Sequence, residues 1–105
     1  MRRTELCKSL WGLSCPLVTA TDYKCSEKDR DAKPVVVITA RVHPGETGAS
    51  WMMQGVLDYV TSNVPRAVEL RKRAVLKLIP VLNPDGVAVG NNRTSLCGKD
   101  LNRCV

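Results

Sequence analysis

Residues 34–46 have the sequence PVVVITARVHPGE, in which a run of β-branched residues leads into a histidine, a proline, a glycine and a glutamate. Continuous runs of this kind are typical of strands that are covered on both faces, as in the centre of an α/β sheet. We therefore predict a strand over Val35–Ala40. The apolar residues that follow have helical spacing, which predicts a helix over roughly Glu46–Ser62.

Two further apolar stretches extend this unit. Cys15–Thr21 and Val75–Leu82 are rich in β-branched and aliphatic residues and predict two more strands, the second with a bulge or an edge at Pro80. A second short helix is expected to begin at Pro65, because proline suits the first position of a helix. The order of elements predicts an α/β fold, with a partial mixed sheet and flanking helices.

The remaining parts of the chain carry weaker patterns. Residues 2–10 are expected to form a short helix, while the charged residues 26–33 and the Gly- and Asn-rich residues 87–105 are expected to be loops. We divide the chain into an N-terminal segment, residues 1–14, and an incomplete domain over residues 15–105.

Composition excludes several classes of protein. The chain carries 16 Lys and Arg against 10 Asp and Glu, a formal net charge of +6, and 4% of its residues are aromatic. Its longest apolar run falls far short of the roughly 18 residues that a membrane span needs, and no apolar segment follows the basic start as in a secretory signal. The five cysteines include no Cys-x-x-Cys pair, which favours reduced thiols over a disulfide framework. We therefore expect a cytoplasmic protein that does not enter membranes.

His43 is the single histidine of the chain, and Glu46 follows three residues later. Since the residue before a proline prefers extended geometry, we expect His43 at the very end of its strand, with Gly45 allowing a sharp turn. An imidazole nitrogen and a carboxylate placed in this way can supply two of the three protein ligands of an open zinc site. Taken alone, the four residues fit an ordinary strand-to-helix turn with a capping glutamate.

A second polar loop, Asn83-Pro84-Asp85-Gly86, follows the last predicted strand. If the two strands before these loops are parallel neighbours, both loops leave the same carboxyl edge of the sheet, where open α/β sheets bind ligands. Arg93, Asn102 and Arg103 lie beyond the second loop. Guanidinium and amide groups of this kind hold carboxylates and stabilise oxyanions, although each arginine taken singly fits a solvated surface charge.

Four motifs in a fixed order resemble the zinc carboxypeptidase superfamily: residues 34–47 (PVVVITARVHPGET), 49–53 (ASWMM), 82–87 (LNPDGV) and 100–103 (DLNR). Within it, the HPGE tetrapeptide and the SLCGKDLNR sequence of residues 95–103 look like the cytosolic carboxypeptidase branch. Members of that branch shorten polyglutamate or acidic C-terminal tails, notably of tubulin. The resemblance implies a fragment of the zinc carboxypeptidase fold and a Zn²⁺-dependent hydrolase whose partners are acidic protein tails.

The resemblance also implies a role for five residues. His43 and Glu46 match the family's first two zinc ligands, and Arg93 matches the arginine that polarises the scissile carbonyl. Asn102 and Arg103 match the pair that holds the terminal carboxylate of the substrate. The NPDG loop matches a loop that shapes the site.

The family's third zinc ligand, a second histidine, and its general-base glutamate lie downstream of the Asn-Arg pair and have no counterpart in these 105 residues. Cys97 or Cys104 offers a thiolate instead, but the spacing to His43 fits no standard zinc module. We therefore expect an amino-terminal part of a catalytic domain that is inactive by itself.

Two other functions stay open at this point. One is a non-catalytic remnant that binds acidic tails through its basic surface. The other is an amidohydrolase relative of the same fold that acts on acylated amino acids. Nucleic acid is not expected as a partner, because no basic stripe is interleaved with aromatic residues.

Overall fold

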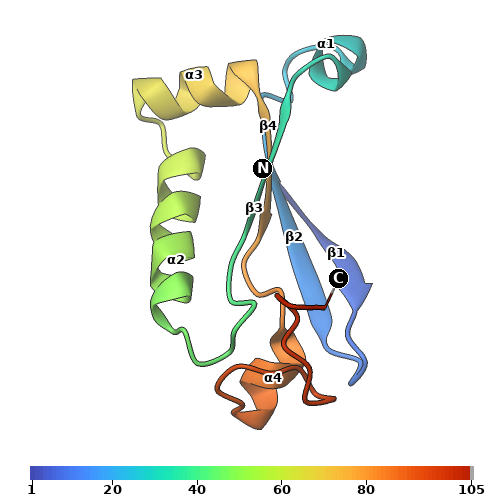
Figure 1. Cartoon of the computed structure of the whole chain (residues 1–105). Helices are drawn as coiled ribbons and strands as arrows, with labels where there is room; N and C mark the ends of the chain where they lie inside the picture. Colours follow the sequence, from blue (N-terminus) through green and yellow to red (C-terminus); the bar gives the residue numbers. More distant parts are fainter. Residues whose placement is uncertain (105) are drawn as a thin grey trace.

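A four-stranded mixed sheet organises the chain in the computed structural model, which describes residues 1–104 (Figure 1). The strands lie in the order β1-β2-β4-β3 and are β1 (Arg2–Lys8), β2 (Ser14–Ala20), β3 (Val35–Thr39) and β4 (Val75–Ile79). β2 is antiparallel to β1 and to β4, whereas β3 and β4 run parallel. The predicted α/β class with a mixed sheet is confirmed, as are the three strands predicted from apolar runs.

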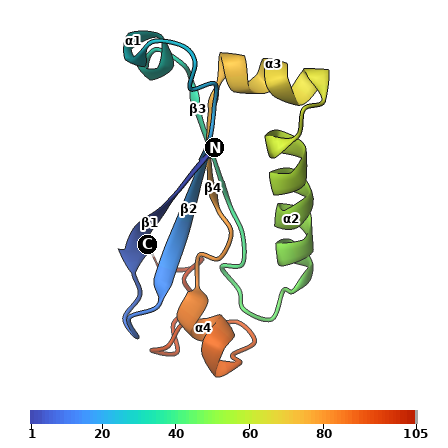
Figure 2. The ribbon, with the colours of Figure 1, turned by 180° about the vertical axis from the view of Figure 1, so that it is seen from behind.

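Four helices complete the fold: α1 (Glu27–Asp31), α2 (Gly48–Thr61), α3 (Pro65–Arg73) and α4 (Pro84–Val89). The connection from β3 to β4 runs through α2 and α3, as a parallel pair of strands requires a crossover. α2 runs along one side of the sheet in both views (Figures 1 and 2). The helix predicted from Pro65 is confirmed, and the helix predicted from Glu46 begins two residues later. None of the helices within residues 1–104 has the length and apolar character of a membrane span.

The core lies between α2 and one face of the sheet. It consists of small and aliphatic side chains from β2, β4, α2 and the residue before β4: Val18, Ala20, Met53, Val60, Ala74, Leu76 and Leu78. Leu78, on the inner strand β4, is completely buried. Side chains of a strand alternate between the two faces of the sheet. The residues between these core positions on β2 and β4 therefore point to the opposite face.

No helix that contributes to the core lies on the opposite face of the sheet within residues 1–104. This differs from the expectation that β3 is covered on both faces. The valine run predicted a strand covered on both faces, but β3 is the edge strand, and Val35 and Val37 are each 59% exposed. Within residues 1–104 the strand has one neighbouring strand and one helix-covered face. The β-branched run therefore reflects strand propensity correctly, but not burial.

The helix predicted for residues 2–10 is wrong, because this segment forms β1. Its residues pair with β2 from Arg2 opposite Thr19 to Lys8 opposite Ser14. All seven residues of β1 are exposed, so no pattern of buried positions marked the strand. Pairing with β2, the next strand along the chain, overrides the local pattern here. The boundary drawn between residues 14 and 15 lies at the start of β2.

Three further predictions also differ from the structure, namely a charged loop, the NPDG turn and a bulge at Pro80. The charged segment expected as a loop contains α1, which Ser26 caps by accepting the backbone N–H of Asp29. The NPDG sequence begins α4 instead of a simple turn, with Asn83 as its cap, so the loop predicted over residues 87–105 starts later than expected. β4 ends before Pro80, so this proline follows the strand and makes no bulge in it.

Candidate metal and substrate site

The parallel pair β3 and β4 brings two loops to the same edge of the sheet, as predicted (Figure 1). The backbone N–H of Leu82 donates to the carbonyl of Ala40 at 2.9 Å. The buried Asn83 amide then donates to the carbonyls of Val42 at 3.1 Å and Thr94 at 3.3 Å. One side chain thus ties the loop after β3 to the segment that follows α4.

The loop after β3 changes direction at Arg41 and again in a turn over Pro44 and Gly45, which the backbone N–H of Glu46 closes by donating to the carbonyl of His43 at 3.2 Å. Arg41 has a left-handed backbone with φ of 58°, and its side chain donates to the carbonyl of Pro44 at 2.8 Å and to Ser50 Oγ at 2.6 Å. Gly45 also allows a close approach of the backbone, because a Cβ there would lie 2.7 Å from the carbonyl oxygen of Asn92, which accepts the Gly45 N–H. The turn predicted at Gly45 is therefore confirmed, and the left-handed residue Arg41 was not predicted.

This turn buries His43 in the loop, four residues beyond the last residue of β3, and not at the end of the strand as expected. Glu46 follows just before α2. His43 Nδ1 lies 3.2 Å from Glu46 Oε1, so the imidazole and the carboxylate face each other as the sequence spacing predicted. The side chain of Glu46 is 63% exposed, whereas that of His43 is 8% exposed.

The other nitrogen of the imidazole contacts a residue that our sequence analysis did not assign. His43 Nε2 lies 3.0 Å from Asp100 Oδ1, and the second oxygen of Asp100 accepts a 2.7 Å hydrogen bond from Arg93 Nε. Arg93 therefore joins the cluster through Asp100. A signal was available, because histidines that bind metal usually have a carboxylate or carbonyl on their second nitrogen, and Asp100 lies within the DLNR motif.

Two opposing effects set the pKa of Asp100. Loss of water around the carboxyl raises its pKa, but hydrogen bonds from His43, from Arg93 and from the backbone N–H of Asn102 outweigh this and lower it from 3.8 to about 2. The carboxylate is therefore the favoured form throughout the ordinary pH range. The Asp100 carboxylate is hydrogen-bonded to His43 Nε2, and His43 Nδ1 faces Glu46.

Replacing Asp100 by asparagine should remove a pH-dependent part of the stability. Because the pKa is lower in the folded chain than in the unfolded one, the carboxylate stabilises the fold above about pH 4, and this contribution is lost as the pH falls through about 2. Urea unfolding midpoints of the metal-free chain and of Asp100→Asn should differ at neutral pH and converge in acid. A difference that is the same at every pH would contradict this prediction.

Asn102 and Arg103 lie next to the cluster along the chain. The backbone N–H of Asn102 donates to Asp100 Oδ1 at 3.0 Å, and Arg103 Nη1 donates to the carbonyl of Asn102 at 3.0 Å. Asn102 and Arg103 are both exposed, and among residues 1–104 neither side chain is hydrogen-bonded to His43 or Glu46. The structure thus brings Arg93 to the imidazole through Asp100, but it leaves Asn102 and Arg103 at the rim.

The residues present fit part of a zinc site. Zinc accepts imidazole nitrogen and carboxylate oxygen, and the His43–Glu46 pair offers one of each on a single side. Within residues 1–104, however, no three His, Cys, Asp or Glu side chains come together as a metal site. The exposed Cys97 and Cys104 therefore do not complete one, and the Cys104 thiol donates to the carbonyl of Asp100.

Known proteins of one family are similar to this chain. The zinc carboxypeptidase family model matches residues 1–104. The chain is 55% identical over 98 residues to cytosolic carboxypeptidase 2 of Danio rerio and 50% identical over 110 residues to cytosolic carboxypeptidase 1 of Homo sapiens. These alignments cover 93% and 97% of the chain, but the chain spans only 14% and 9% of the length of those relatives.

Solved structures of metallo-carboxypeptidases have the same fold as this chain. The metallo-carboxypeptidase of Burkholderia cenocepacia superposes with a TM-score of 0.85 at 34% identity, covering 97% of this chain and 27% of that one. The resemblance inferred from the four motifs is thereby confirmed. The chain belongs to the zinc carboxypeptidase family.

Proposed function

We propose that the chain supplies the first two zinc ligands and part of the substrate site of a zinc metallocarboxypeptidase. The observation that carries this proposal is the buried imidazole of His43, with Nδ1 facing the Glu46 carboxylate and Nε2 held by Asp100. Zinc, when bound, polarises a carbonyl and makes water a nucleophile near neutral pH. The third protein ligand and the general base would come from residues outside these 105, so the chain by itself should not turn over substrate.

Each remaining residue of the cluster has a task that follows from its contacts. Asp100 orients the imidazole by occupying Nε2, and Arg93 holds Asp100 through Nε. The Nη nitrogens of Arg93 have no hydrogen-bond partner among residues 1–104 and are free to stabilise negative charge on a substrate carbonyl. Asn102 and Arg103 at the rim are suited to hold a terminal carboxylate, because a guanidinium grips a carboxylate with two parallel hydrogen bonds.

The substrates we propose are acidic C-terminal protein tails, with those of tubulin as one example, cleaved in the cytoplasm. The net charge of +6 supports acidic partners, and the relatives are named cytosolic carboxypeptidases. The DLNR segment favours a peptidase over an amidohydrolase of the same fold, because it places an amide and a guanidinium next to the Asp100 cluster.

A chimeric enzyme tests this function. This chain would replace the matching segment of the Danio rerio cytosolic carboxypeptidase 2, and release of glutamate from a glutamate-tailed peptide would be measured with zinc present. We expect the chimera to release glutamate and the isolated chain to release none. In the chimera, Glu46→Gln should lower kcat/KM by about 100-fold or more, because it removes a proposed zinc ligand, and loss of only the hydrogen-bond partner of a ligand already costs about 10- to 100-fold.

The matched control is Arg66→Gln, which removes an exposed charge on α3 and should leave kcat/KM unchanged. Glutamate release by the isolated chain would show that no outside ligand is needed. A Glu46→Gln chimera as active as its parent would exclude Glu46 from the zinc site. Hydrolysis of an acylated amino acid but of no peptide would favour the amidohydrolase instead.

A further inference from the structure

Two cysteines lie opposite each other in the hairpin that β1 and β2 form. Cys7 of β1 is the register partner of Cys15 of β2, and the pair follows a bulge at which Leu6 has no partner. Both cysteines are free thiols. Their pairing is a property of the hairpin itself and involves none of the residues of the candidate metal site.

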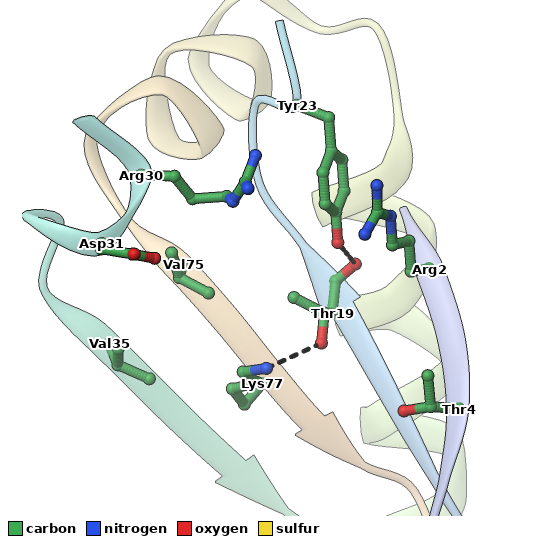
Figure 3. A pocket seen from close by; sticks show the side chains of 9 residues that line it. All are labelled: Arg2, Thr4, Thr19, Tyr23, Arg30, Asp31, Val35, Val75 and Lys77. Atoms are coloured by element: carbon green, nitrogen blue, oxygen red, sulfur yellow. Dashed lines mark hydrogen bonds between the residues drawn. The ribbon is translucent and has the colours of Figure 1, made fainter. Parts of the chain in front are cut away.

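Register partners on these two strands project from the same face of the sheet. Arg2 and Thr19, which are partners further along the hairpin, line one pocket together with Tyr23 and Lys77 (Figure 3). The same rule applies to the two cysteines, because directly opposite side chains of an antiparallel pair lie on one side. Their thiols are therefore neighbours across the strands.

The spacing of an antiparallel pair suits a disulfide. The Cα atoms of directly opposite residues are about 4.5 or 5.5 Å apart, depending on whether the pair is hydrogen-bonded. Disulfides join residues whose Cα atoms are about 4.4–6.8 Å apart. Both kinds of pair lie within this range, so Cys7 and Cys15 can be joined by side-chain rotation with little movement of the backbone.

The two thiols have different surroundings. Cys15 is 4% exposed, and its thiol donates to the carbonyl of Val81 at 3.4 Å, whereas Cys7 is exposed within residues 1–104. Burial, and then the neighbouring Cys7 thiol, raises the pKa of the Cys15 thiol. Since the thiolate is the reactive form, Cys7 should react first with a small disulfide and Cys15 should react second.

We propose that Cys7 and Cys15 form a reversible thiol–disulfide pair that responds to oxidised glutathione. The Cys7 thiolate attacks one sulfur of oxidised glutathione, which forms a mixed disulfide and releases one glutathione. Cys15 then loses its proton and attacks the Cys7 sulfur, which releases the second glutathione. Two protein thiols are thereby oxidised, one glutathione disulfide is reduced, and the two thiol protons end on the two glutathione molecules.

Oxidation would change a contact that leads towards the candidate metal site. A disulfide at Cys15 has no S–H group, so the carbonyl of Val81 loses its donor. Val81 lies just before Leu82 and Asn83, whose hydrogen bonds join the two loops of the site. Disulfides of this kind in reducing compartments are usually transient and redox-sensing, which fits a pair that is reduced at rest.

Peptide mass spectrometry of the complete chain, incubated with oxidised glutathione and then blocked at its remaining thiols, tests the proposal. Trypsin places each cysteine in a different peptide, namely residues 4–8, 9–24, 25–28, 94–99 and 104–105. We expect peptides 4–8 and 9–24 to be joined at least about tenfold more often than any other pair, because opposite residues meet disulfide geometry. Dithiothreitol should restore both thiols.

A matched variant moves the thiol to the neighbouring position of β1. The double variant Leu6→Cys, Cys7→Ser places it on the bulge residue, which has no partner on β2. The chain between the two thiols keeps almost the same length, so loop closure costs nearly the same. Linkage to Cys15 should nevertheless fall about tenfold, because the register no longer brings the two Cβ atoms together.

Two single variants test the order of the steps. Cys15→Ser should accumulate the mixed disulfide with glutathione on Cys7, because the second thiol is missing. Cys7→Ser should leave Cys15 largely as a thiol and, since it alters an exposed residue of β1, keeps the test valid if Cys15→Ser fails to fold.

Three results would overturn the proposal. The first is a glutathione adduct that persists on Cys7 of the parent chain while Cys15 stays a thiol. The second is equal linkage in the parent and in the Leu6→Cys, Cys7→Ser variant, and the third is a disulfide that joins two chains through Cys7. None of these measurements uses zinc or a substrate, so their failure would leave the proposed hydrolase function untouched.

Discussion

Zinc binding by the chain is expected to vanish when His43 is replaced by alanine. His43 supplies the nitrogen that faces Glu46, and with two protein ligands the parent chain should bind zinc weakly but saturably. Removal of one ligand leaves a single exposed carboxylate. Asp100→Asn should weaken binding by about 10- to 100-fold, as is typical when the hydrogen-bond partner of a metal-binding histidine is lost. Isothermal titration calorimetry measures the zinc affinity of the parent chain, of His43→Ala and of Asp100→Asn.

Two further variants separate the metal ligands from the fold and from the thiols. Glu46→Gln alters an exposed side chain and should also abolish zinc binding while leaving the circular dichroism spectrum unchanged. Replacement of both Cys97 and Cys104 by serine should leave zinc binding intact, because neither thiol belongs to a metal group within residues 1–104. Binding that survives His43→Ala but disappears with the double serine variant would contradict the assignment.

Gly86→Ala is expected to destabilise the chain by about 1–3 kcal/mol, the usual cost of forcing an extra methyl group into a packed site. Gly86 is buried in the first turn of α4, and an added Cβ would lie 2.7 Å from both Asn83 Nδ2 and the carbonyl oxygen of Thr94, and would overlap the ring of Pro44. The substitution therefore presses on the Asn83 contacts that join the loops of the site. Urea unfolding followed by circular dichroism measures the loss.

Gly55→Ala is the matched control for this effect. Gly55 lies in the middle of α2, where an added Cβ meets nothing within 4 Å, so alanine should stabilise the chain by about 0.5–1 kcal/mol through helix propensity. The two substitutions add the same methyl group but should shift the unfolding midpoint in opposite directions. Equal shifts of the unfolding midpoint in the two variants would show that the residues around Gly86 leave room for a Cβ.

Much of the candidate site could be anticipated, because its main parts are local in sequence. His43 and Glu46 are three residues apart, so the turn between them brings their side chains together. The parallel arrangement of β3 and β4 followed from two apolar runs separated by helical segments. Asp100 was not assigned although it stands in the DLNR motif, because its contact with His43 joins residues 57 positions apart and the motif alone does not show which residue it meets.

Two of the failures in the fold, those for β1 and β3, have a common cause, because both depend on which other segments lie beside the strand. β1 is exposed along its whole length, so its strand conformation depends on backbone pairing with β2 and not on a pattern of apolar residues. The valines of β3 carry the pattern of a buried strand, but burial depends on which segments cover a face.

The amino-acid sequence by itself determined the class of fold, the helices α2 and α3 and the His43–Glu46 pair, since these depend on periodicity, turn residues and short spacing. Only the tertiary structure decided that Asp100 orients the imidazole, that Asn83 joins the two loops, and that Arg2, Lys77 and Tyr23 share one pocket. Each of these depends on contacts between segments distant in the chain, and such contacts form only when strand pairing and core packing have fixed the position of every element.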